Sequence, residues 1–312
     1  MIVRVRARLR RLVALASGPS PIHPMRAHLL LTAALFAACS TAADRPASPV
    51  GPAASSSWAE PSGESLPATA TSGVIPKTTR QLLTVVTEDW RATDGDLQRW
   101  QRTGAGWAEV GEPVPVVVGR SGLGWGIGLH GEGALGPDAE PGDPAKAEGD
   151  GRAPAGAFRL ARAFGYADAE PTRLPYVAAT PSAVCIDDAA SPRYNTVFDA
   201  GRDPATLGVS LERMRRDDTL YRIGVIVDHN GGGELGTAPV PGAGSCIFLH
   251  VWRGPGTTTA GCTAMPDAAL AEALGWLDAE AGPVLVQLPQ PAYDRLAGGW
   301  ELPSRGGEAG GR

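Results

Sequence analysis

Short apolar runs between glycine and proline turns are the feature that most limits how this chain can fold. Its 312 residues include 41 glycines and 28 prolines. Between these turns lie runs rich in β-branched and aromatic residues, which are typical of strands. Long helices do not alternate with these runs, so the pattern predicts a mainly β, antiparallel domain, either a sandwich or a barrel. The expected strands cover residues 81–87, 97–102, 107–110, 114–119, 158–161, 221–230, 247–252 and 284–288.

One or two short helices are expected in addition. Leu270, Leu274 and Leu277 recur at helical spacing behind Pro266, which predicts an amphipathic helix within residues 266–280. Residues 210–218 form the second candidate, with a mixed-charge face that we expect to be solvated.

The first 39 residues are typical of an export signal. Residues 1–11 carry five arginines and no acidic residue, and Met25 begins a second basic segment with an apolar run over residues 29–38 and then Cys39. This order is that of a bacterial lipoprotein signal peptide, and the run is too short to span a bilayer. We expect Met25 to be the true start and Cys39 to be lipidated, in a periplasmic or cell-envelope lipoprotein. An N-terminal membrane anchor is the alternative.

Composition divides the rest of the chain. Residues 40–76 are almost all Ala, Ser, Pro, Gly and Thr, and such a segment cannot bury enough apolar surface to offset its ordering entropy. We therefore predict a disordered linker over residues 40–76 and a folded domain over residues 77–290. Residues 291–312 are predicted to be a C-terminal tail, with a frayed, Gly-rich end over residues 304–312.

Charge and missing motifs exclude several function classes. The formal net charge is −5, and no basic cluster follows the signal, which argues against a nucleic-acid partner. The sequence has no phosphate-binding loop of the GxxxxGK[ST] type, no His-Glu-x-x-His and no CxxC pair, so nucleotide, zinc-protease and thioredoxin functions lack support. We predict no cofactor. A metal site made of Cys246, His250 and Cys262 would lack closely paired ligands.

A histidine on a strand, followed twelve positions later by a cysteine, is the clearest chemical motif. Residues 247–252 carry His250, and a Gly/Pro/Thr loop leads to Gly261 and Cys262. One turn can bring the imidazole to the thiol, the arrangement that activates a cysteine nucleophile, and Gly261 lets the backbone approach a substrate. Taken singly, each residue has a structural alternative as part of the core. His130, which also precedes a glycine, is a rival base.

The segment around Cys262 resembles the active-site motif of the L,D-transpeptidase (YkuD-type) family. That motif reads Ser-His-Gly-Cys-Ile/Val-Arg after a strand that carries a histidine. Here it stands as Thr-Ala-Gly-Cys-Thr-Ala-Met over residues 259–265, so that Ala260 replaces the motif histidine and Ala264 replaces the arginine. Residues 153–158, Ala-Pro-Ala-Gly-Ala-Phe, resemble the Thr-Pro-x-Gly-x-Phe turn that the family carries upstream. The resemblance covers roughly residues 81–289.

The resemblance implies a fold, a reaction and a substrate. It implies a YkuD-like domain in which Cys262 attacks a peptidoglycan stem peptide, His250 acts as base, and backbone amides around Gly261 and Cys262 hold the oxyanion. An amine is the acceptor in cell wall cross-linking or remodelling. A carboxypeptidase with the same residues and a non-catalytic wall-binding lipoprotein remain alternatives.

Three further residues are candidates for substrate contact: Arg253, Thr259 and Thr263. Arg253 opens the loop that returns to Cys262, so its guanidinium is a candidate replacement for the missing motif arginine, and a solvated loop arginine is the alternative.

Two cysteines remain outside the signal and the motif. Cys185 and Cys246 both lie beside expected strands, and an exported protein meets an oxidising environment. A Cys185–Cys246 disulfide is therefore the economical hypothesis, with two buried thiols as the alternative.

Overall fold

The computed structural model describes residues 73–132, 136–231 and 237–305, and this part of the chain is mainly β, as the sequence predicts. The strands are β1 (Gln81–Thr87), β2 (Asp94–Thr103), β3 (Gly106–Val117), β4 (Leu123–Trp125), β5 (Ala153–Gly165), β6 (Tyr176–Ala178), β7 (Ala183–Ile186), β8 (Val197–Asp199), β9 (Leu211–Arg213), β10 (Ile223–Val227), β11 (Phe248–Val251), β12 (Thr263–Met265) and β13 (Val284–Pro289). The α-helices of the described residues are α1 (Asp267–Trp276) and α2 (Gln290–Trp300).

Eight strands of the main sheet pair in a closed ring. Following the hydrogen-bonded neighbours leads from β10 through β11, β12, β3, β2, β1, β13 and β5, and β5 pairs with β10 again. The join between β12 and β3 is the narrowest, with Ala264 opposite Val117. The pairing is mainly antiparallel, as predicted, although β1–β13 and β11–β12 run parallel. The loop of residues 252–262 returns the chain from the end of β11 to the start of β12, which permits this parallel pair.

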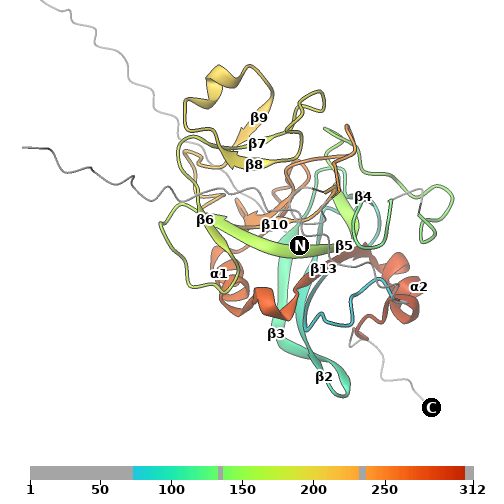
Figure 1. The fold of residues 1–312 in the computed structure, drawn as a ribbon. Helices are drawn as coiled ribbons and strands as arrows, with labels where there is room; N and C mark the ends of the chain where they lie inside the picture. The colour runs from blue at the N-terminus through green and yellow to red at the C-terminus, as the bar shows by residue number, and fades with distance from the viewer. Residues whose placement is uncertain (1–72, 133–135, 232–236, 306–312) are drawn as a thin grey trace, which may run out of the picture. The chain divides into compact units, whose positions relative to one another are not determined.

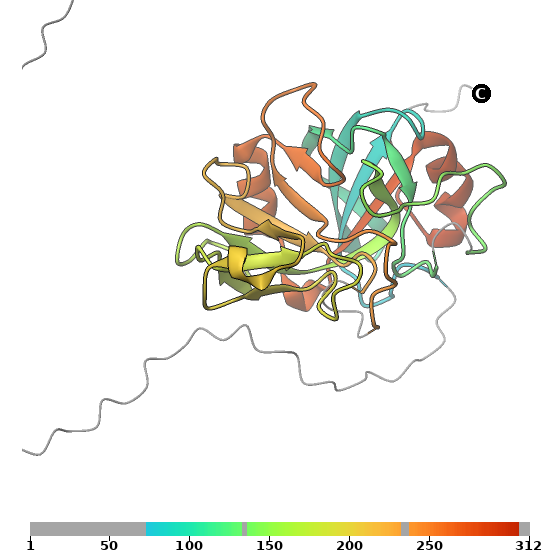
Figure 2. The same ribbon diagram turned by 90° about the horizontal axis from the view of Figure 1, so that it is seen from above.

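The core fills the inside of this ring. Every residue of β1 and of β13 is buried, as expected for strands covered on both faces. Helix α1 packs against β10 and β11, and α2 packs against β13 and β1. Figures 1 and 2 show the two helices at opposite ends of the sheet. Pro266 stands at the N-cap of α1, close to the predicted start, and Leu270 and Leu274 face the core as their spacing predicts.

A second, three-stranded sheet in the order β8-β7-β9 lies beside the main one, drawn in yellow in Figure 1. We call it the small sheet. Its strand β9 falls within residues 210–218, where the sequence predicted a short helix, and that prediction is wrong. The backbone of β9 pairs with β7, with Val184 opposite Arg213 and Ile186 opposite Leu211. Pairing with a strand distant in sequence thus overrides a weak local helix preference.

Both ends of the folded domain extend beyond the predicted boundaries. Residues 290–300 form helix α2 where a tail outside the domain was expected, and Trp300 is only 2% exposed. Ile75, placed in the linker by its surroundings in the sequence, is also 2% exposed and belongs to the core. Composition hides these segments because a few large apolar side chains suffice to anchor them. The predicted signal, the lipidation site Cys39 and most of the predicted linker lie outside the described residues.

Candidate functional site

The pocket that contains Cys262 is built on two parallel strands. β11 carries His250, and Cys262 comes directly before β12, with His250 opposite Ala264 in the ladder. Alternate residues of a strand share a face, so Cys262 and Ala264 point to the same side of the sheet as His250. All three line one pocket of about 430 Å³. The structure thus brings together the two residues that the sequence singled out.

A turn centred on Thr259 holds the cysteine in place. The Thr259 hydroxyl donates to the carbonyl oxygen of Cys262 at 2.6 Å and accepts the amide of Gly261 at 3.1 Å. A side chain at Gly261 would place its Cβ 3.0 Å from the carbonyl oxygen of Arg152, which is tighter than ordinary contact. The Gly261 amide thus has a structural role in this turn, and its predicted role in holding an oxyanion stays a prediction.

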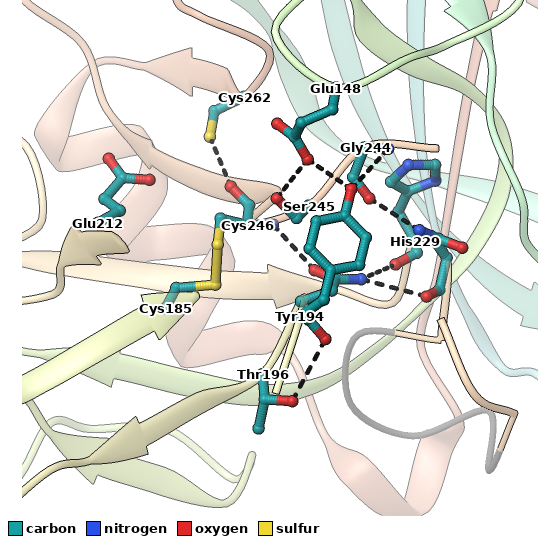
Figure 3. Close-up of a disulfide and its surroundings, with 12 residues drawn as sticks. Glu148, Cys185, Tyr194, Thr196, Glu212, His229, Gly244, Ser245, Cys246 and Cys262 are labelled. Atoms are coloured by element: carbon teal, nitrogen blue, oxygen red, sulfur yellow. Dashed lines mark hydrogen bonds between the residues drawn. A yellow bond between two sulfur atoms is a disulfide. The ribbon is translucent and has the colours of Figure 1, made fainter. Parts of the chain in front are cut away.

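The Cys262 thiol is protonated at rest. Its residue is 8% exposed, and Sγ donates to the carbonyl oxygen of Cys246 at 3.5 Å (Figure 3). Burial and, to a smaller extent, the nearby Glu212 carboxylate raise the thiol pKa to about 12. The Phe248 amide and the Tyr221 hydroxyl act in the opposite direction. A nucleophilic attack from this site needs a base that removes the proton as the new bond forms.

His250 has the protonation state that such a base needs. Its Nδ1 lies 2.8 Å from the carbonyl oxygen of Val251, and because a carbonyl only accepts, Nδ1 must carry the hydrogen. Nε2 therefore has the free lone pair. Burial lowers the His250 pKa to about 4, so the imidazole is neutral at pH 7 and able to accept a proton.

The small sheet supplies the wall next to these two residues. Tyr221, just before β10, packs its ring edge-on to His250 at 5.2 Å between centroids and donates its hydroxyl to Glu212 Oε1 at 2.6 Å. Glu212 lies on β9 and pairs with Arg216 at 3.5 Å, and the Arg216 guanidinium stands over the Tyr221 ring at 5.2 Å. Burial raises the pKa values of both Tyr221 and Glu212. Sequence reasoning missed this cluster; the start of a predicted strand at Tyr221 was its only signal.

The three predicted substrate contacts have different environments. Arg253 lines the pocket, but its side chain is 60% exposed and pairs with Asp218 at 3.4 Å. Thr259 also lines the pocket, with its hydroxyl committed to the turn described above. Thr263 is buried, and its hydroxyl donates to Gln287 Oε1 at 2.6 Å. The Thr263 side chain is therefore buried between strands and does not line the pocket, contrary to the predicted substrate contact.

His130, the rival base, is a structural residue. Its Nδ1 accepts the amide of Ala157 at 3.1 Å, so Nε2 carries the hydrogen and donates to the carbonyl oxygen of Gly126 at 3.0 Å. Both ring nitrogens are therefore occupied, and the ring packs among Trp125, Phe158 and Trp300 outside the residues that line the pocket.

A disulfide joins Cys185 to Cys246, the pair predicted from the sequence, with an S–S distance of 2.04 Å. Cys246 adopts a left-handed backbone conformation with φ 55°, and its amide donates to Asn195 Oδ1 at 2.9 Å. Next to it, Glu148 accepts the hydroxyls of Ser245 and Tyr194 (Figure 3). These contacts fix the position of the Cys246 carbonyl oxygen, which accepts the hydrogen bond from the Cys262 thiol.

Within residues 73–132, 136–231 and 237–305, no His, Cys, Asp and Glu side chains gather in a group of three or more that could hold a metal ion. In the same part of the chain, no helix has the length and apolar character that crossing a membrane requires. The chain matches no protein-family model, no curated protein and no solved structure.

Proposed function

We propose that this protein is a cysteine-dependent acyltransferase of the L,D-transpeptidase (YkuD-type) class that acts on peptidoglycan stem peptides. One observation carries the proposal: a protonated thiol and a neutral imidazole with a free Nε2 point from adjacent parallel strands into one pocket. The motif order along the chain and the closed, mainly β sheet are consistent with a divergent YkuD-like fold.

The proposed reaction uses these two side chains and an amine. Cys262 Sγ attacks the carbonyl carbon of the third stem residue while His250 Nε2 takes the thiol proton. The bond from that carbon to the nitrogen of the fourth residue breaks, and His250 returns the proton to the departing amine. An acceptor amine then attacks the thioester, loses a proton through His250, and releases the thiol. Water in place of the amine gives the carboxypeptidase alternative.

The predicted export of the protein belongs to the same proposal. Structural disulfides persist mainly in oxidising compartments, so the Cys185–Cys246 bond supports a periplasmic or cell-envelope location. Attachment to a membrane through Cys39 is proposed on the signal motif alone.

Acylation by a carbapenem tests the chemistry, since the family's nucleophile accepts this ligand class. We expect a mass increase of one carbapenem on the wild-type protein and none on Cys262→Ala. We expect His250→Gln to slow acylation by about 10²- to 10⁴-fold, the usual contribution of a general base. The alternative, a non-catalytic wall-binding lipoprotein, is supported by the burial of the Cys262 thiol. It predicts that no covalent adduct forms between the carbapenem and the wild-type protein.

A further inference from the structure

We propose that Arg120 binds the terminal carboxylate of the stem peptide, the group that leaves with the fourth residue. This inference rests on the proposed function and names a substrate contact that the missing motif arginine would otherwise leave open. It concerns a different residue from Arg253, the replacement expected from the sequence.

Four cationic side chains line the pocket, and three of them are already paired. Lys146 Nζ pairs with Asp150 at 2.8 Å, Arg216 with Asp218 at 3.1 Å, and Arg253 with Asp218 at 3.4 Å. Arg120 has no carboxylate partner among the residues that the structure describes. Its only side-chain hydrogen bond there runs from Nη2 to the carbonyl oxygen of Gly149 at 3.3 Å. A guanidinium has five N–H donors, so most of this fork is open to a ligand.

The backbone of Arg120 is fastened to the turn that holds the nucleophile. Its amide donates to the carbonyl oxygen of Thr259 at 2.9 Å, and Gly119 forms an isolated bridge with the same residue. Thr259 in turn binds the carbonyl oxygen of Cys262. The backbones of Arg120 and of Cys262 are therefore both hydrogen-bonded to Thr259.

A glycine leaves room for the Arg120 side chain. Gly151 has φ 74°, and a Cβ at that position would lie 2.8 Å from three atoms of the Arg120 side chain. The arginine therefore lies over this turn, where any other residue would displace it. Arg120 is exposed, so its guanidinium is accessible to a ligand.

The charges of the pocket favour the same assignment. Three acidic residues line it: Asp187 and Glu212 belong to or adjoin the small sheet, and the Glu148 carboxylate accepts the hydroxyls of Ser245 and Tyr194. Arg120 comes from the segment between β3 and β4. A substrate carboxylate is repelled by the acidic wall and attracted by an unpaired guanidinium, which matches a carboxylate with two parallel hydrogen bonds.

Two peptides separate a carboxylate contact from a general effect. The first is a stem tetrapeptide with a free C-terminal carboxylate, and the second is the same peptide with a C-terminal amide. We expect wild type to prefer the carboxylate in kcat/KM, and Arg120→Ala to lose about tenfold on the carboxylate and little on the amide. Arg120→Lys should keep part of the preference. Arg173→Ala, which removes a 62% exposed arginine outside the pocket lining, is the charge control.

Binding to Cys262→Ala makes the test independent of turnover. Calorimetry on this variant should show tighter binding of the carboxylate peptide, and addition of Arg120→Ala should abolish the difference. If wild type turns over neither peptide but this difference in binding holds, the proposed reaction fails and the assignment of Arg120 stands. The assignment of Arg120 would be overturned if Arg120→Ala lost kcat/KM equally on both peptides or not at all. It would also be overturned if only Arg253→Ala lost the preference for the carboxylate peptide.

Discussion

Burial sets the protonation states of the two candidate reactive side chains of the pocket. Burial keeps the Cys262 thiol protonated and the His250 imidazole uncharged. Many cysteine enzymes lower the thiol pKa with a neighbouring cation; here Lys146 acts in that direction, but burial and the Glu212 carboxylate outweigh it. The proposed reaction therefore requires proton transfer to His250 as the thiol attacks the substrate.

Glu212→Gln tests the influence of this carboxylate at the level of one residue. Glutamine still accepts the Tyr221 hydroxyl, but it removes the negative charge that raises the Cys262 pKa. We expect the thiolate fraction, and with it the rate of alkylation by iodoacetamide at pH 8 to 9, to rise severalfold.

The next residue on β9 provides the matched control. Arg213 is the neighbour of Glu212, but it pairs with Asp203 on the outer side, with 47% of its side chain exposed. Arg213→Gln should leave the alkylation rate unchanged. An unchanged or slower rate in Glu212→Gln would mean that the carboxylate does not control the thiol.

At the scale of elements, the small sheet has a role beyond packing. It carries Glu212 and is tied by Cys185 to the segment that precedes β11. The same disulfide fixes Cys246, whose carbonyl oxygen accepts the Cys262 thiol. The stability of the small sheet and the position of the Cys262 thiol are therefore coupled through the Cys185–Cys246 bond.

Removal of the disulfide should lower stability and also disturb the thiol. The bond closes a loop with a sequence separation of 61 residues, and the chain-entropy relation gives about 4 kcal/mol for such a loop. For a domain of this size we expect the melting temperature of Cys185→Ala/Cys246→Ala to fall by roughly 10 °C, measured by calorimetry.

The cysteine variant also has a local readout. Hydrogen exchange should rise most in β7, β8 and β9, and less in β1 and β13, which lie in the buried centre of the main sheet. A melting temperature within about 2 °C of wild type would indicate that the packing of Phe164, Tyr221 and Phe248 alone holds the small sheet.

At the scale of the whole molecule, three buried neutral histidines make folding sensitive to acid. Burial lowers the pKa values of all three: that of His229 falls to about 3, that of His250 to about 4, and that of His130 also falls. An unfolded histidine titrates near pH 6.5. Between these values the unfolded chain binds more protons than the folded one, so the free energy of unfolding falls as the pH falls. Glu212, with its raised pKa, opposes this trend in part.

Urea unfolding at a series of pH values checks this expectation. The urea midpoint should begin to fall below pH 6.5 and continue to fall toward pH 4, because the free energy of unfolding drops by a few kcal/mol, at about 1.36 kcal/mol for each unit of pKa difference. Carboxylates with lowered pKa, such as Asp199 and Asp218, lose their contribution only at lower pH. A midpoint that stays constant from pH 7 to pH 4.5 would show that the histidines are not buried neutral in solution.

The sequence by itself determined the elements whose pattern is strong and local. Alternation between apolar runs and turns predicted most strands, leucine spacing predicted α1, and compartment and position predicted the Cys185–Cys246 bond. The placement of His250 and Cys262 around one pocket also followed from sequence, because a single loop joins β11 to the residue before β12.

Only the tertiary structure decided contacts between segments that are distant in the chain. β9 is a strand because β7 pairs with it, and α2 is ordered because its buried face meets β13 and β1. Tyr221 and Glu212 line the same pocket as Cys262 because the Tyr221 hydroxyl donates to Glu212 on the small sheet. Arg120 lines this pocket too, and its amide donates to the carbonyl oxygen of Thr259. Local propensity carries no record of such contacts, because their free energy arises from burial and pairing that exist only in the folded chain.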